Sequence, residues 1–242
     1  MLKVISQTIK IGVTYTFMTL VFLSCASENE KSGLDKIGEH YNAKVSYTKS
    51  FSRKANGKNE SAFNIRVENS PMLDTLTSGQ TSTAIAMMFY ESLTNEEKET
   101  CETVTVAIKK STKDKSDKFR LNGQILEACL DQSKIYNFFS EKLIDEDYDK
   151  IANSVLKEFY KDTLGDEVGV FVDSLIGEHG KIKSYQLTGI GVTTEDPNNK
   201  HYIYSGFLTF KDGYKRPYIV NASVDKNKDD ITGFTLEKGV QL

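Results

Sequence analysis

The sequence predicts an α+β protein in which a small N-terminal α+β domain precedes a domain of three helices and a four-stranded antiparallel curved sheet. Three observations carry this prediction. Apolar and polar residues alternate in two early segments, which is typical of half-buried strands. Apolar residues then recur at helical spacing over 125–143. Four further alternating segments follow one another with short turns between them, near 182–194, 201–211, 215–225 and 230–237.

The expected N-terminal domain covers residues 33–122. Its first two strands are predicted from Val45 and Tyr47 on one segment and from Phe63 and Ile65 on the next, with an Asn-Gly turn signal at 56–57 between them. A helix is predicted over 83–93, capped by the hydroxyls at 81–82, and its segment 84–90 is apolar on all sides, as in a core helix. A capping box at 94–97 and a strand at 103–108 complete this unit.

The expected C-terminal domain covers residues 123–242. Its first helix carries the apolar positions of 125–143, and a second is predicted to run through Ile151, Val155 and Phe159. A third helix from about Glu167 should carry the apolar residues Val170, Phe171 and Leu175 and end at Gly177 or Gly180. The four strands that follow predict a meander.

The first 24 residues have the pattern of a secretory signal peptide. Lys3 and Lys10 precede an apolar stretch of 13 residues, at 11–23, and a membrane-spanning helix needs about 20. A buried N-terminal helix is the alternative interpretation. Residues 25–32 are expected to form a short solvated tether, and the folded body is expected to begin near Gly33.

The segment Phe22-Leu23-Ser24-Cys25 resembles a bacterial lipobox. Ser24 fits the small residue before the cysteine, whereas Leu23 and Phe22 depart from the strictest pattern and match looser Gram-negative variants. The resemblance implies cleavage before Cys25, acylation of its sulfur and attachment to the outer membrane. Stable anchoring needs more than one acyl chain, as a triacylated cysteine provides. Acidic residues at 28 and 30 resemble a surface-export signal, and the periplasmic and the surface-exposed side both remain open.

The C-terminal domain resembles the cystatin-like, nuclear-transport-factor-2-like superfamily, and within it small bacterial domains of unknown function. The resemblance rests on Ile176-Gly177-Glu178-His179-Gly180-Lys181-Ile182-Lys183-Ser184-Tyr185 and on Asp230-Ile231-Thr232-Gly233-Phe234, and covers about 124–238. It implies a sheet bent around a helix into a cone. Some relatives use the cone as an enzyme pocket and others bind a partner or dimerise, so the fold does not give the function.

Charge and motifs exclude several classes of function. The 242 residues carry a net charge of −3, and because Lys3 and Lys10 precede Cys25, a chain starting there has 29 basic and 34 acidic residues, or −5. This balance gives no reason to expect nucleic-acid binding. No motif for a nucleotide, a zinc protease or a serine hydrolase occurs, and we expect no cofactor.

Candidate site residues are few. His179 and His201 could line the mouth of the cone, and Tyr202, Tyr204 and Tyr218 could line its pocket or form an interface. No catalytic residue is assigned. Cys101 and Cys129 could form a disulfide or remain buried thiols. A turn starting at Asp225 has oxygens at alternate positions but lacks the glycine and glutamate of a calcium loop, so no metal site is expected.

The sequence therefore favours a lipid-anchored envelope protein that acts as a non-enzymatic binding or protein-interaction module. Tyr202, Tyr204 and Ile203 make one strand apolar on both faces, so its sheet needs two covers. The second cover could be the N-terminal unit, a second copy of the chain, or a partner. Two alternatives stay open: an enzyme or small-ligand-binding protein that uses the cone, and a structural lipoprotein that dimerises through its sheet.

Overall fold

The computed structural model describes residues 26–53, 59–157, 161–193, 200–225, 227 and 230–236. These residues form an α+β fold with seven helices and two four-stranded sheets, as the sequence predicts. The signal segment at 1–24, Cys25 and the Asn-Gly turn at 56–57 lie outside the described residues. None of the described helices is long and apolar enough to cross a membrane.

The first sheet has the order β1-β2-β3-β4. Its strands are β1 (Lys44–Arg53), β2 (Asn59–Glu68), β3 (Cys101–Lys109) and β4 (Asp117–Asn122). Strands β1 and β2 pair antiparallel, as their alternation indicates, whereas β2 and β3 pair in parallel. The parallel pairing requires a long crossover, which is made by α3 (Pro71–Thr75), α4 (Ser78–Ser92) and α5 (Asn95–Thr100).

Helix α2 (Glu28–Tyr41) corrects the predicted tether at 25–32. Ser27 is its N-cap, and Ser27 and Glu30 form a reciprocal capping box. Helix α4 also begins earlier than predicted, with Thr77 at the N-cap, so that Thr81 and Ser82 lie buried inside the helix instead of capping it. The apolar interior of α4 and the capping box at Thr94 and Glu97 are confirmed.

The second sheet is the predicted meander, in the order β5-β6-β7-β8 with antiparallel pairs. Its strands are β5 (Ile182–Val192), β6 (His201–Phe210), β7 (Lys215–Ser223) and β8 (Ile231–Thr235). Three helices precede it: α6 (Gly123–Ile144), α7 (Tyr148–Asn153) and α8 (Leu164–His179).

The end of one of these helices differs from the prediction. Helix α7 ends at Asn153, because Val155 leaves the helix and forms a bridge with Ile231. Helix α8 buries Val168 and Val172, while Val170 is 75% exposed. Gly180, one of the two positions at which the helix was predicted to end, is its C-cap.

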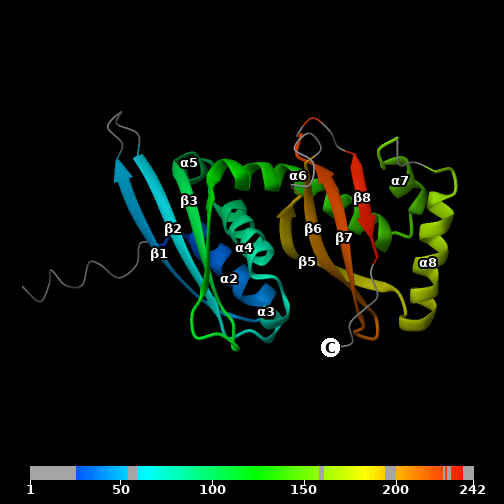
Figure 1. The fold of residues 1–242 in the computed structure, drawn as a ribbon, viewed down its shortest axis with the longest axis horizontal. Helices are drawn as coiled ribbons and strands as arrows, with labels where there is room; N and C mark the ends of the chain where they lie inside the picture. Colours follow the sequence, from blue (N-terminus) through cyan, green and yellow to red (C-terminus); the bar gives the residue numbers. More distant parts are fainter. Residues whose placement is uncertain are drawn as a thin grey trace, which may run out of the picture.

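The two sheets share one hydrophobic core. Helix α4 packs on β3 and β4 of the first sheet and on β5 of the second, and α6 contacts strands of both sheets. Figure 1 shows α6 running from one sheet to the other, with α2 and α4 behind the first sheet. The division at residue 123 stays a prediction, but the contacts across it are extensive.

The second sheet has two differently covered faces. We call the face that packs on α6 the inner face; it includes Tyr204 and Tyr218, which are fully buried. The opposite, outer face is covered along β5 by α4: a Cβ added at Gly189 or Gly191 would lie only 3.0–3.1 Å from Gln80. The N-terminal unit thus supplies part of the second cover that the sequence requires.

Candidate functional site

Aromatic side chains fill the inner face of the second sheet. Tyr136 and Phe139 of α6 both lie over Tyr218, with ring centroids 5.4 and 6.2 Å away and nearly parallel planes. Tyr204 lies 6.0 Å from Tyr136. The backbone at Gly206 is so close to Tyr136 that an added Cβ would lie 2.0 Å from the tyrosine hydroxyl oxygen. The predicted pocket residues Tyr204 and Tyr218 are therefore core residues.

The tyrosine hydroxyls on this face are held by neutral partners. The hydroxyls of Tyr218 and Ser140 lie 2.5 Å apart, and that of Tyr204 donates to the carbonyl oxygen of Cys129 at 2.8 Å. Burial raises the pKa of Tyr202 to about 12, and its neighbour Cys129 adds to the effect. These phenols stay protonated at neutral pH.

Cys101 and Cys129 are both buried free thiols, so the predicted alternative of a disulfide is not found. Burial raises the pKa of Cys101 to about 11 and that of Cys129 to about 12. A thiol is nucleophilic as the thiolate, and both groups are kept protonated at neutral pH.

His179 and His201 do not come together. His179 ends α8 and lies 5.9 Å from Phe210, at one end of β6, whereas His201 begins that strand. Nine residue steps of about 3.3 Å separate the two ends. The two imidazoles are therefore about 30 Å apart and cannot act on one substrate atom.

His179 joins α8 to the turn between β6 and β7. Its Nδ1 lies 2.9 Å from a carboxylate oxygen of Asp212, and its ring stacks on Tyr214 at 3.8 Å. The pKa of Asp212 is lowered, first by the backbone N–H of Tyr214 and then by His179. We call this contact, which holds α8 to the β6–β7 turn at the protein surface, the surface clamp.

His201 presents a different environment. Its backbone carbonyl accepts from Thr193 N–H at 3.0 Å. Its Nδ1 is buried and has no hydrogen-bond partner among the described residues. Tyr202, which follows it, is 7% exposed.

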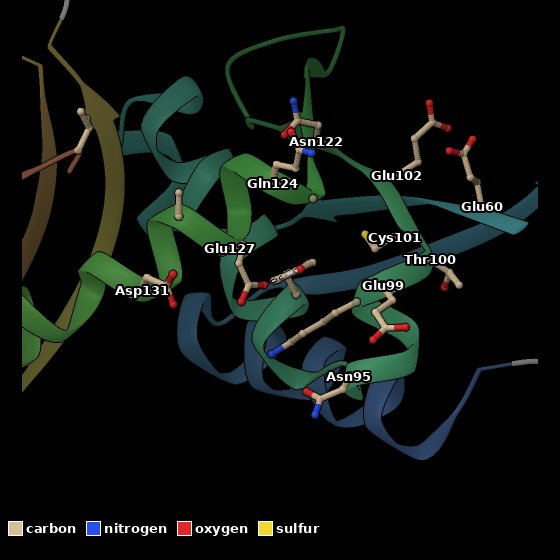
Figure 2. A pocket seen from close by; sticks show the side chains of 15 residues that line it. Glu60, Asn95, Glu99, Thr100, Cys101, Glu102, Asn122, Gln124, Glu127 and Asp131 are labelled. Atoms are coloured by element: carbon tan, nitrogen blue, oxygen red, sulfur yellow. Dashed lines mark hydrogen bonds between the residues drawn. The ribbon is translucent and has the colours of Figure 1, made fainter. Parts of the chain in front are cut away.

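A hollow on the protein surface is lined by none of the five predicted residues. It is a groove of about 1120 Å³ between α5, the start of β3 and the start of α6, shown in Figure 2. Five acidic side chains and one lysine line it, together with Tyr90, Cys101, Val224 and polar groups. The charged residues are Glu60, Lys98, Glu99, Glu102, Glu127 and Asp131. We call it the acidic groove.

Two contacts hold Tyr90 in the wall of the acidic groove. Tyr90 donates its hydroxyl to Glu127 at 2.6 Å, and the ammonium of Lys98 lies 5.4 Å from the Tyr90 ring centroid. Burial and the hydrogen bond to Glu127 raise the pKa of Tyr90. Among the described residues no group of three or more histidine, cysteine, aspartate or glutamate side chains is placed to hold a metal ion.

Sequence reasoning missed the acidic groove. Glu127 and Asp131 are four residues apart on α6 and share one helix face, which was the available local signal. Glu60 and Glu102 come from β2 and β3, and only the crossover between those strands brings them to the same place.

No protein-family model, curated protein or solved structure matches this chain.

Proposed function

We propose that this protein is a lipid-anchored component of the bacterial cell envelope, attached to the outer membrane through Cys25, that acts as a non-enzymatic interaction module. The apolar segment at 11–23 and the lipobox-like residues before Cys25 support the anchor. The C-terminal likeness to the cystatin-like superfamily is compatible with a binding role and remains part of the proposal.

The observation that carries the anchor is the position at which the folded body starts. The Ser27 hydroxyl oxygen caps α2 by accepting from the Glu30 backbone N–H. The Ser27 backbone N–H donates to the Glu30 carboxylate in return. An ordered helix therefore has its N-cap two residues after Cys25, so a lipid on this cysteine would lie next to the folded body.

The acidic groove is the proposed interaction surface. Aromatic rings occupy the inner face of the second sheet, where the enzyme alternative would need an open cavity with an acid–base pair. The acidic groove instead offers five carboxylates against one lysine across a broad opening. Electrostatic complementarity favours a partner that presents lysine or arginine side chains.

Dimerisation through the second sheet is the second candidate. Ile203 and Phe207 of β6 and Ile219 of β7 lie on its outer face and are only half-buried. Light scattering on the full chain separates the candidates: a stable dimer whose mass falls after Phe207→Ser supports dimerisation, and a monomer at all concentrations rules it out.

The anchor is tested by palmitate labelling and membrane fractionation. The wild-type chain should incorporate palmitate and sediment with membranes, and Cys25→Ala should lose both properties. Cys101→Ser is the matched control, because it removes a different thiol and should keep both. If Cys25→Ala remains labelled and membrane-bound like the wild type, the lipoprotein proposal is wrong.

The acidic groove is tested with a defined probe, a fluorescent lysine-rich peptide at low ionic strength. Binding should weaken with salt and should be lost in Glu99→Lys with Glu102→Lys. Glu178→Lys with Glu141→Lys, an equal change of charge at exposed positions on α8 and α6, should leave binding unchanged. Binding that is equally affected by both changes would contradict a site in the acidic groove.

A further inference from the structure

The first turn of α2 is a fixed part of the fold. Glu30 is fully buried, and its carboxylate accepts from the Tyr47 hydroxyl at 2.7 Å and from the Lys49 ammonium at 2.5 Å. Both partners lie on β1, so the start of the helix is held against the sheet by an enclosed ion pair. Unwinding this turn into a linker would leave charged groups without partners.

The chain between this turn and Cys25 is very short. Only Ala26 lies between Cys25 and Ser27, and a fully extended chain spans at most about 7 Å over these two residue steps. The headgroup layer on each side of a bilayer is about 5–7 Å thick. A lipid on Cys25 therefore cannot hold the folded body away from the membrane.

We propose that the end of the molecule where α2 begins lies in the headgroup layer of the bilayer, with the ring of Phe51 inserted among the lipids. This inference rests on the lipidation of Cys25 proposed above. It adds a second, non-covalent contact between the protein and the membrane and fixes which end of the molecule faces the lipid.

Phe51 is the residue that points to this contact. It lies on β1 and is 70% exposed, which is unusual for a phenylalanine. The Lys49 ammonium that binds Glu30 also lies 4.8 Å from the centroid of the Phe51 ring. One lysine thus joins the exposed ring to the first turn of α2, whose N-cap is two residues after Cys25 in the sequence.

The charges at the end of the molecule where α2 begins are compatible with a membrane contact made by the lipid on Cys25 and the ring of Phe51. Among the described residues at this end, Glu28 and Glu96 are opposed by Lys31, Lys98 and Arg53. This mixed set is smaller than the clusters of basic residues that bind anionic headgroups. Aromatic side chains, in contrast, are favoured at the boundary between headgroups and acyl chains.

The chain contains no tryptophan, so Phe51→Trp introduces a single fluorescent probe at an exposed position. The full lipidated chain is reconstituted into phosphatidylethanolamine–phosphatidylglycerol vesicles with or without brominated acyl chains. We expect a blue shift on reconstitution and loss of most of the fluorescence in the brominated vesicles. Val170→Trp on α8 is the control: Val170 is 75% exposed, and α8 lies at the opposite end of the molecule from β1 (Figure 1). It should show neither effect.

Two failures can be told apart by floating the same samples with the vesicles. If the chain floats but the tryptophan of Phe51→Trp is neither shifted nor quenched, the inserted ring is refuted and the anchor stands. Equal quenching of both variants would refute the orientation. If the chain does not float and Cys25→Ala behaves identically, the anchor is refuted, and this inference is refuted with it.

Discussion

The two halves of the molecule place polar groups in opposite ways. In the N-terminal half, a charged pair is buried: the side chain of Glu30 is fully enclosed and that of Lys49 is 15% exposed. In the C-terminal half, neutral hydroxyls hold the aromatic layer, the buried guanidinium of Arg216 donates to the neutral carbonyl of Leu236, and the His179–Asp212 contact lies at the surface. The N-terminal half, which begins beside the proposed lipid, thus contains the interaction whose loss should cost more free energy.

Because of this difference, the free energy of unfolding should depend on different substitutions in the two halves. A buried charge that loses its partner costs several kcal/mol, about 3–5 in measured cases. A surface pair contributes about 0–1 kcal/mol, and one neutral hydrogen bond about 0.5–1.5 kcal/mol. Each of the following predictions tests one side of this comparison, starting with the largest expected effect.

Glu30→Gln should be the most damaging of these changes. It leaves the Lys49 ammonium without its carboxylate and should lower the free energy of unfolding by about 3 kcal/mol, measured by urea denaturation. Glu28→Gln, two residues earlier and exposed, should stay within about 0.5 kcal/mol of the wild type. Equal effects of the two changes would show that the buried pair is not important.

Gly206→Ala tests the tight packing of the second sheet. The added methyl group would lie 2.0 Å from the Tyr136 hydroxyl oxygen and 2.6 Å from the Gln186 carbonyl oxygen. We expect a loss of about 2 kcal/mol from overpacking. Gly177→Ala is the opposite control, since nothing lies within 4 Å of the added Cβ and alanine favours the helix by about 0.5–1 kcal/mol. A higher free energy of unfolding in Gly206→Ala than in the wild type would refute the close packing of Gly206 against Tyr136.

Tyr218→Phe removes one neutral hydroxyl and keeps the ring. The loss of its contact with Ser140 should lower the free energy of unfolding by about 1 kcal/mol, a smaller effect than that of Glu30→Gln. Ser140 keeps the hydrogen bond that it donates to the Tyr136 carbonyl oxygen. A loss as large as that of Glu30→Gln would mean that the hydroxyl network, too, acts as a dominant interaction.

The sequence predicted the strands and helices better than the burial within them. The alternation of Phe63 and Ile65, the capping box at Thr94 and the meander of the second sheet are local patterns, and all three are present. The sequence places Glu30 in a solvated tether, because the residues that follow Cys25 are polar and acidic. Its burial depends on Tyr47 and Lys49, which are 17 and 19 residues away.

The site was less predictable than the fold for the same reason. Tyr204 and Tyr218 were correctly placed on one face of the sheet, but whether that face is open or filled depends on Tyr136 and Phe139 from α6. The exposed Val170 on α8 shows the same limit within one helix, since Val168 and Val172 have equal apolar character and are the residues that pack.

High pH should affect the C-terminal half through its tyrosines. A tyrosine in an unfolded chain has a pKa of about 10, whereas Tyr202 has its pKa raised to about 12. A pKa raised by folding gives stability that is present below pH 10 and is lost as pH rises towards about 12. Tyrosinate absorbance should therefore appear later than in the unfolded chain, and Tyr202→Phe should remove one tyrosine's share of the absorbance that appears near pH 12. An unchanged titration in Tyr202→Phe would contradict the assignment.

The smallest effect is expected at the surface clamp. His179→Ala removes the contact to Asp212 and the stack on Tyr214, and should change the free energy of unfolding by less than about 1 kcal/mol. Because the pKa of Asp212 is lowered in the folded state, its contribution is present at neutral pH and is lost on acidification through that lowered pKa. Asp212→Asn should therefore weaken the acid dependence of stability. A strong loss at neutral pH would contradict a surface role.

The central claim, that Cys25 carries the lipid directly beside the folded body, is tested most directly by the mass of the mature N-terminal peptide from membrane-extracted protein. The account predicts a peptide that begins at Cys25 and carries a diacylglyceryl thioether and an N-acyl group. A peptide that begins at Met1, or one in which Cys25 carries no lipid, would contradict it.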